Sequence, residues 1–341
     1  MTKDEFYIKR CIELAKKAIG KTYPNPMVGS VIVHRDEIIG EGYHHKAGEN
    51  HAEINAIKSV KNPHLIPEST LYVSLEPCAH FGKTPPCSLK IKELGFKKVV
   101  IGAMDSHDKV NGKGKKIIQD AGIEVVSGIL EEECIDLNKK FFTFHEKKRP
   151  YIILKWAQSK DGFVDKDFQP AAISNALVNQ IMHKLRADED AILVGTQTAI
   201  ADNPSLTVRN VTGKNPTRII LDWNLKIPSD YNIFNQDART IIINSVKDSE
   251  EHHIQYIKTG KNQPLQNIID ILYQQQIQSV IIEGGAYTLQ RFIDENLWDE
   301  VIIITNNDLE LQTGTKAPIF CYPNYSETQV RNNSIKKYFK S

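Results

Sequence analysis

Apolar residues along the chain alternate between helical and extended spacing. Between Phe6 and Ile19 they recur every three to five positions, which predicts a helix with one buried face that ends at Gly20. Extended patterns predict strands at 28–34, 37–41, 70–75, 99–101 and 123–126, and helical patterns predict helices at 52–60, 88–95, 115–120 and 131–146. This alternation is typical of a sheet covered by helices.

A charged stretch, Lys147 to Arg149, is followed by Pro150, which is incompatible with a helix interior. We therefore predict two domains, 1–147 and 148–341, a division that suits a length of 341 residues. The second half repeats the α/β alternation, with strands expected at 151–157, 191–194, 218–222, 240–244, 279–283 and 300–305, and helices at 176–186, 267–276 and 286–296.

Charge and composition narrow the possible partners. The 43 basic and 42 acidic residues give a net charge of +1, so no overall field attracts nucleic acid or an anionic membrane. The sequence has no apolar run of about 20 residues and no signal-peptide pattern in its first ten positions. The five cysteines form an odd set without a disulfide framework, which leaves thiolates available for a metal. We expect a cytoplasmic protein that acts on a small molecule and binds neither nucleic acid nor membranes.

His51, Glu53, Cys78 and Cys87 form the pattern with the most specific chemistry. His51-Ala-Glu53 is expected to open a helix, as is the segment with Cys78, and Cys87 follows after eight residues. An imidazole and two thiolates are a natural zinc set that leaves the fourth position for water. Zinc lowers the pKa of that water toward neutrality, and Glu53 is placed to move protons from the water to a leaving amine. The pattern predicts a zinc-dependent deaminase.

Two rival classes stay open from these residues alone. Zinc deaminases generally read H-x-E followed by P-C-x-x-C, whereas the spacer between Cys78 and Cys87 is longer here. A deaminase acting on nucleic acid would normally show a basic face. A noncatalytic zinc scaffold would use four protein ligands and would have no need of Glu53.

Three segments, Pro24–Gly29, Gly48–Glu53 and Ser74–Cys87, resemble the deaminase half of bacterial riboflavin-biosynthesis deaminase/reductases. The resemblance implies a cytidine-deaminase-like three-layer α/β/α domain with a zinc ion on His51, Cys78 and Cys87. It also implies that Glu53 is the proton shuttle. The implied substrate is a diaminopyrimidinone carrying ribosylamine phosphate, whose ring amine is hydrolysed to a carbonyl. The residues implied to line its pocket are Asn25, His44, His80, Lys83 and Asp105.

Near the C-terminus, Gly284 and Gly285 stand between a predicted strand and a predicted helix. Paired glycines let backbone amides approach a pyrophosphate, and the start of a helix favours anions. Together with Lys155–Gly162 and Gly195–Arg209, this segment resembles the reductase half of the same family, which has a dihydrofolate-reductase-like α/β fold. The resemblance implies that NADPH contacts Gln158, Ala172, Thr198, Asp202, Trp223, Gly285, Ala286, Tyr287, Thr288, Leu289, Gln290 and Arg291.

The same resemblance implies a substrate site in the second domain, made by Pro170, Arg186, Leu206, Arg209 and Glu283. Arginine suits a sugar phosphate because its guanidinium binds two oxygens at once. Lys155 and Glu283 are candidates to position or protonate the sugar while a hydride reaches its C1 carbon, which turns ribosyl into ribityl.

The chain departs from the family pattern in three places. Asp105-Ser-His-Asp108 replaces a frequent D-P-N-P, so His107 would have to supply the contact of the family's asparagine. Ala172 stands where an aromatic residue is usual, and a glycine-rich segment is reduced to Gly314. We expect a bifunctional homo-oligomeric enzyme with one zinc ion per chain and NADPH; the alternative is a monofunctional pyrimidine or nucleoside deaminase with a degenerate C-terminal binding domain.

Overall fold

The computed structural model of this protein describes residues 1–81, 85–106, 110–260 and 264–340. Contacts along the chain divide it into two units, Met1–Lys147 and Lys148–Ser341. Each buried hydrophobic cluster draws its described residues from one unit only, so each unit has a core of its own. Within the described ranges, no helix combines the length and apolar character that crossing a bilayer demands.

The first unit is built on a five-stranded sheet with the order β2-β1-β3-β4-β5. β1 pairs antiparallel with both β2 and β3, whereas β3, β4 and β5 run parallel. The strands are β1 (Gly29–His34), β2 (Glu37–Tyr43), β3 (Thr70–Leu75), β4 (Lys98–Ala103) and β5 (Glu124–Ser127). The helices are α1 (Lys3–Lys16), α2 (Ala52–Ser59), α3 (Cys87–Leu94), α4 (Lys113–Gln119), α5 (Glu131–Leu137) and α6 (Lys139–Lys147), with a 3-10 turn, η1 (Pro63–Glu68).

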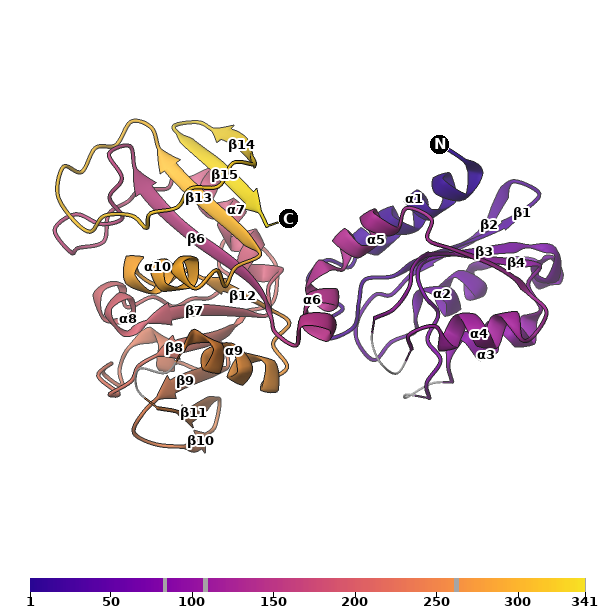
Figure 1. Cartoon of the computed structure of the whole chain (residues 1–341), viewed down its shortest axis with the longest axis horizontal. Coiled ribbons are helices and arrows are strands. Elements are labelled where there is room, and N and C mark those ends of the chain that lie inside the picture. The colour runs from indigo at the N-terminus through magenta and orange to yellow at the C-terminus, as the bar shows by residue number, and fades with distance from the viewer. Residues whose placement is uncertain (82–84, 107–109, 261–263, 341) are drawn as a thin grey trace. The chain divides into compact units, whose positions relative to one another are not determined.

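Alternation along the central strands explains the three layers of this unit. On β1, Val31 and Val33 pack in the cluster of α1 and α5, whereas Ile32 packs in the cluster of α2, α3 and α4. Successive side chains of a strand point to opposite faces, so a strand buried on both sides feeds two cores. Figure 1 shows α1 and α5 on one face of the sheet and α2, α3 and α4 on the other.

The second unit contains a ten-stranded sheet with the order β10-β11-β9-β8-β7-β12-β6-β13-β15-β14. Its strands from β11 to β13 in this order are parallel, and β10, β15 and β14 are added antiparallel at the edges. The strands are β6 (Tyr151–Ser159), β7 (Ala191–Gly195), β8 (Thr217–Leu221), β9 (Thr240–Asn244), β10 (Ser249–Glu251), β11 (Ile254–Lys258), β12 (Ser279–Ile282), β13 (Glu300–Asn306), β14 (Tyr325–Val330) and β15 (Asn333–Phe339).

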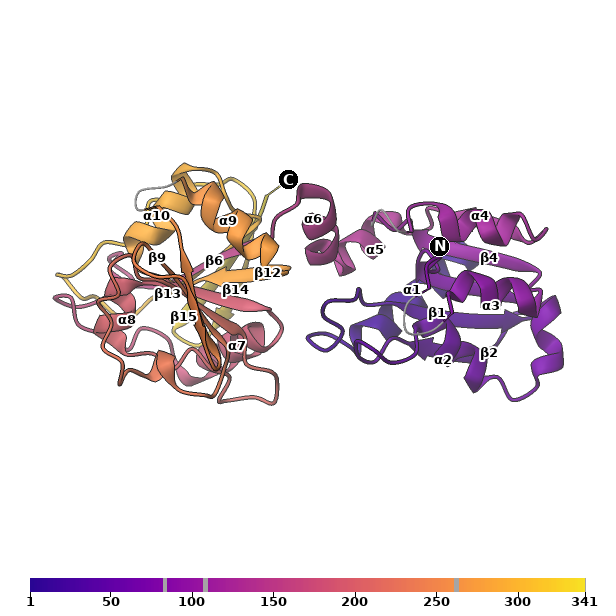
Figure 2. The same cartoon turned by 90° about the horizontal axis from the view of Figure 1, so that it is seen from below.

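Helices cover both faces of this larger sheet. They are α7 (Ala176–Ala187), α8 (Thr196–Asp202), α9 (Leu265–Gln274) and α10 (Ala286–Asp294), with a 3-10 turn, η2 (Asn232–Phe234). Residues of α9 and α10 share a cluster with Leu154 and Leu193, whereas residues of α7 pack with Ile153. Figure 2 shows α9 and α10 on one side of the sheet and α7 on the other. Because the central strands are parallel, their carboxyl ends gather along one edge, where α/β sheets bind ligands.

Several predicted elements are wrong in detail. The single helix expected at 131–146 is two helices, because Asn138 lies between α5 and α6 and uses its side chain to bond both backbone groups of Met27, at 2.8 and 2.9 Å. The last strand is not 300–305, since β14 and β15 follow it. Cys78 does not open a helix: it lies in a nonhelical segment between β3 and α3.

Candidate active sites

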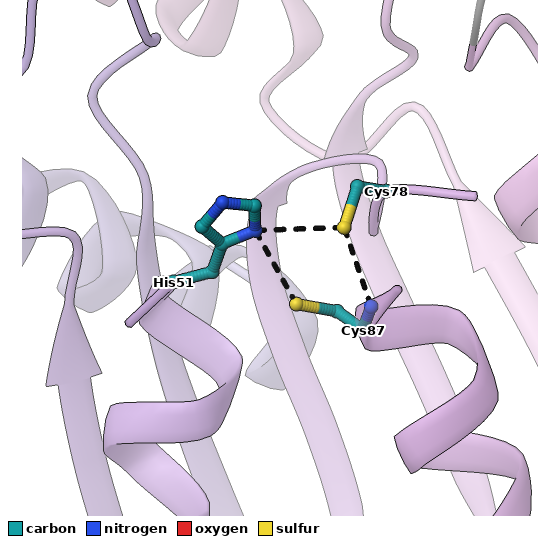
Figure 3. A group of neighbouring side chains, drawn as sticks. All are labelled: His51, Cys78 and Cys87. Atoms are coloured by element: carbon teal, nitrogen blue, oxygen red, sulfur yellow. Dashed lines mark hydrogen bonds between the residues drawn. The ribbon is translucent and has the colours of Figure 1, made fainter. Parts of the chain in front are cut away.

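The metal centre predicted from His51, Cys78 and Cys87 is assembled from three segments. His51 is the residue before α2, Cys78 follows β3, and Cys87 is the first residue of α3. His51 Nδ1 lies 3.5 Å from Cys78 Sγ and 3.4 Å from Cys87 Sγ, as Figure 3 shows. All three ligand atoms lie within 4.8 Å of one another. The structure thus brings together three donors that are far apart in sequence.

These separations fit a tetrahedral zinc ion. With bonds of about 2.3 Å to sulfur and 2.0 Å to nitrogen, ligand atoms in such a site lie roughly 3.3–3.8 Å apart. The Cys87 N–H also donates to Cys78 Sγ at 3.2 Å, which orients that sulfur. The His51, Cys78 and Cys87 set therefore suits zinc, with the remaining coordination position open for water.

Charges within the centre favour a thiolate. Hydrogen bonding from the Cys87 thiol, with His51 beside it, lowers the pKa of Cys78 to about 4. Contact with the Cys78 sulfur in turn raises the pKa of His51 to about 9. A lowered thiol pKa favours the thiolate, which is the form of cysteine that binds a metal.

Glu53 lies on the first turn of α2, two residues beyond His51, and is only 3% exposed. Burial raises the pKa of Glu53 to about 7, and the nearby Cys78 sulfur acts in the same direction. A carboxyl group with a pKa near neutrality can both accept and release a proton, as a proton shuttle must. A divalent cation nearby would favour the carboxylate form and lower this pKa.

Asn25 and His44 lie against the metal centre. Asn25 Nδ2 donates to His44 Nε2 at 3.0 Å, and His44 Nδ1 lies 3.0 Å from the carbonyl of Asn50. The His44 ring meets the His51 ring edge-on, with centroids 5.3 Å apart. Burial lowers the pKa of His44, so the ring is neutral, with Nδ1–H donating and Nε2 accepting. Two of the residues implied to line the pocket are thus linked to each other.

The other residues implied to line this pocket differ in their exposure. Asp105 is buried, just after β4, whereas His80 is exposed in the segment between Cys78 and Cys87. Lys83 and His107 lie outside the described residues.

Glu76 is a structural residue of this site that the sequence analysis missed. It is 4% exposed, and its carboxylate accepts N–H bonds from Gly112 at 2.9 Å, Lys115 at 3.0 Å and Asp105 at 3.4 Å. It thereby ties the segment that carries Asp105 to the strand end that carries Cys78. Its place two residues before Cys78 was the only signal in the sequence.

In the second unit, the carboxyl ends of β7 and β12 each lead through glycine into a helix. The Gly285 N–H donates to Thr198 Oγ1 at 2.7 Å, which joins the start of α10 to α8. A Cβ atom on Gly284 would lie 2.8 Å from the backbone nitrogen of Gly195. One on Gly195 would lie 3.1 Å from Thr288 Oγ1. Gly284 therefore lets the backbones of β12 and β7 approach closely, and the start of α10, at exposed Gly285, suits a dinucleotide's phosphates.

The remaining residues implied to contact NADPH differ in how they are placed. Trp223 follows β8, Asp202 ends α8, and Gln158 accepts from Trp156 Nε1 at 2.8 Å. Leu289 is 2% exposed and its side chain packs in the core. Ala172 lies in the loop between β6 and α7. Ala286, exposed Tyr287, Gln290 and Arg291 lie on α10. Gln290 accepts a hydrogen bond from the Ile319 N–H, and Arg291 forms an ion pair with Glu295.

Glu283 is the centre of a charged group at the end of β12. Its carboxylate lies 3.1 Å from Arg186 Nη2 and 3.5 Å from Lys155 Nζ. Burial alone would raise its pKa, but Lys155 and Arg186 outweigh burial and lower the pKa of Glu283 to about 2. Lys155 lies within β6 rather than at its end. The structure therefore places Lys155 and Glu283, the candidates to act on the sugar, in one charged group with Arg186, which was expected at the substrate phosphate.

Arg209 and Leu206 lie beside this group. Arg186 Nη1 donates to the carbonyl of Thr207 at 3.1 Å, and Arg209 Nη1 lies 3.4 Å from Thr207 Oγ1. Leu206 is buried, so its side chain packs in the core. Pro170 is exposed in the loop between β6 and α7.

Comparison with known proteins identifies the family of each region. Residues 1–103 match the family described as "Cytidine and deoxycytidylate deaminase zinc-binding region", and residues 150–309 match the "RibD C-terminal domain". Fold and sites together define a two-domain enzyme, a zinc-binding deaminase followed by a reductase of dihydrofolate-reductase-like fold. The predicted fold class is confirmed.

Relatives over the whole chain identify the family. The riboflavin biosynthesis protein RibD of Aquifex aeolicus is 40% identical, over 88% of this chain and 86% of that protein. RibD of Escherichia coli is 33% identical, over 88% and 86%. The crystal structure of a diaminohydroxyphosphoribosylaminopyrimidine deaminase/5-amino-6-(5-phosphoribosylamino)uracil reductase from Thermotoga maritima is 34% identical with a TM-score of 0.88, covering 98% of this chain and 97% of that one.

This chain belongs to the RibD family of riboflavin biosynthesis proteins. It is an enzyme with both a deaminase and a reductase domain, so its activities are those of a hydrolase and an oxidoreductase. The alternative of a monofunctional deaminase with a degenerate second domain is wrong.

Proposed function

We propose that the first unit hydrolyses the ring amine of a diaminopyrimidinone ribosylamine 5'-phosphate, and that the second unit reduces the ribosyl group of the product to ribityl with NADPH. The observation that carries the proposal is the convergence of His51, Cys78 and Cys87 on one point, with buried Glu53 on the adjoining helical turn. The related Thermotoga maritima protein is named both as a pyrimidine deaminase and as a uracil reductase, which supports deamination followed by reduction here.

In the deaminase site, His51, Cys78 and Cys87 would hold one zinc ion per chain. When bound, zinc lowers the pKa of a water molecule and so supplies the nucleophile for the ring carbon. Glu53 accepts a proton from that water and delivers it to the neighbouring ring nitrogen. It then moves the remaining hydroxyl proton to the amine, which leaves as ammonia as the C–N bond breaks and the carbonyl forms. Asn25 and His44 orient the pyrimidine, and His80 and Asp105 line its pocket; Lys83 belongs to the same expected set but lies outside the described residues. The two His44 hydrogen bonds keep the His44 ring in one tautomer.

In the reductase site, Gly284 lets β12 pack closely on β7, and the N-terminus of α10 at exposed Gly285 fits the pyrophosphate of the cofactor. NADPH, when bound, supplies the hydride for C1 of the opened sugar. Arg186 and Arg209 bind the substrate phosphate, and the family resemblance assigns Pro170 and Leu206 to the same substrate site. Lys155 donates a proton to the ring oxygen as the sugar opens, and the Glu283 carboxylate keeps Lys155 charged and in place.

Glu53→Gln tests the deaminase assignment. The amide keeps the size of the side chain but cannot carry the proton, so we expect the variant to retain zinc and to lose ammonia release by a factor of roughly 10²–10⁴. Oxidation of NADPH with the deaminated substrate should be unchanged, which controls for folding. Ammonia release close to that of the parent protein would remove Glu53 from this role.

A further inference from the structure

His183 lies in the substrate region of the second unit, and the proposed function gives it no task. It is on α7, one turn before Arg186, and only 8% of it is exposed. The charges that act on it are those of Arg186, Arg209, Lys155 and Glu283, which are the groups assigned above to the sugar phosphate. A histidine buried beside three cations is poorly placed to become a fourth.

The ring of His183 is arranged to accept a hydrogen bond. Burial lowers the pKa of His183, and Arg186 and Arg209 lower it further, so the ring is neutral near pH 7. Its Nδ1 atom accepts the backbone N–H of Arg209 at 3.3 Å. The proton of the neutral ring is then on Nε2.

This bond is one of two described hydrogen bonds that fix the segment from Leu206 to Arg209 to α7. Leu206 has a φ angle of +53°, in a region that leucine rarely adopts, so neighbouring contacts must hold the backbone in place. Arg186 supplies one contact, through the Thr207 carbonyl at 3.1 Å. His183 supplies the second contact, because its Nδ1 accepts the backbone N–H of Arg209.

We propose that His183 is a positioning residue of the reductase: by accepting the Arg209 N–H, it fixes the backbone from which the Arg209 guanidinium reaches the substrate phosphate. The inference rests on the proposed phosphate-binding role of Arg209. A histidine that merely fills the core would affect folding, whereas a positioning histidine affects substrate binding through Arg209 and leaves cofactor binding alone.

The test compares three replacements in the full-length protein. His183→Asn places an amide oxygen near the position of Nδ1 and should keep the KM for the deaminated phosphoribosylamino substrate within about twofold of the parent. His183→Leu removes the acceptor, and His183→Gln moves it outward. Both should raise that KM roughly three- to tenfold, the worth of one neutral hydrogen bond, with little change in kcat or in the KM for NADPH.

The matched control is Gln180→Leu, an exposed position on the same helix, which should leave all constants unchanged. Ammonia release from the same preparations shows that the first unit is intact. If His183→Leu fails to fold, the comparison of His183→Gln with His183→Asn still tests the proposal, because both variants keep a polar side chain. An unchanged KM in both His183→Leu and His183→Gln, or an equal rise in His183→Asn, overturns the proposal.

A double-mutant cycle with Arg209→Ala separates this inference from the proposed function. If His183 acts through the Arg209 side chain, His183→Gln should add less than twofold to the KM of Arg209→Ala. If Arg209→Ala itself leaves KM unchanged, the phosphate-binding role is wrong. If Arg209→Ala raises KM and the two changes multiply independently, only the positioning role is wrong.

Discussion

At the scale of single residues, Glu283 stays ionised in a buried position because two cations face it. Arg186 and Lys155 lower the pKa of Glu283 to about 2, although burial opposes them. Arg186, Lys155 and Glu283 were expected at the substrate through the family resemblance, whereas Glu53 and the zinc ligands also stand in a recognisable motif. His183 and Glu76 were missed because their partners, Arg209 and Gly112, lie far away along the chain. No local pattern records such a contact.

Arg186→Ala should weaken substrate binding in the reductase. The change removes one charge from the phosphate site and leaves Glu283 with Lys155 alone. Hydrogen bonds to charged groups are worth about 1.5–3 kcal/mol, so we expect the KM for the deaminated substrate to rise roughly tenfold to 100-fold. Steady-state kinetics of NADPH oxidation measure this.

Lys184→Ala is the control for that change. Lys184 is on the same helix, and it makes an exposed pair with Asp188 at 2.8 Å that contributes little. Its KM should match the parent protein. An Arg186→Ala enzyme with the parent KM would show that this arginine does not bind the phosphate.

At the scale of elements, the apolar pattern located the buried strands and the long amphipathic helices well. The pattern failed where contacts with distant parts of the chain or exposure to solvent determine the element. The break between α5 and α6 exists because the Asn138 amide bonds Met27. The edge strand β14 is almost entirely exposed, so it carries no alternation of apolar residues. The short helix α8 was missed because only Ala199 among its residues is buried, so the helix shows no apolar face.

Gly284→Ala should damage the contact between β12 and β7 at the cofactor site. The added Cβ would lie 2.8 Å from the Gly195 nitrogen and 2.9 Å from Val194 Cα, both backbone atoms that cannot turn aside. We expect a loss of roughly 1–3 kcal/mol in stability of the second unit and a higher KM for NADPH. Thermal unfolding and NADPH kinetics measure the two effects.

Gly285→Ala offers the comparison. There the new Cβ would meet only the Thr198 hydroxyl, at 3.0 Å, and that side chain can rotate. Its loss of stability should be the smaller of the two. If Gly284→Ala melted at the parent temperature and kept the parent KM, the close approach of these strands would be unimportant for the site.

At the scale of the whole molecule, the two units have separate cores, and each contains the residues proposed for its own reaction. The sequence predicted two α/β domains because the alternation of elements restarts after Pro150. It could not predict the ten-strand order of the second sheet, since β12 inserts between β6 and β7 although it comes much later in the chain.

Fragments 1–147 and 148–341, expressed separately, should each fold and keep one reaction. The first should release ammonia from the diaminopyrimidinone phosphate, and the second should oxidise NADPH with the deaminated product. Rates within about tenfold of the full chain are expected because no proposed catalytic residue is removed from its own core. A fragment that folds cooperatively yet has lost its reaction would show that its site needs the other unit.

Zinc content measured on the same samples as ammonia release tests the central claim most directly. The parent protein should contain zinc and release ammonia, whereas Cys78→Ser should lose both and still oxidise NADPH with the deaminated substrate. Purified protein that releases ammonia without bound metal, or a Cys78→Ser variant that keeps its zinc and its full deaminase rate, would contradict the account.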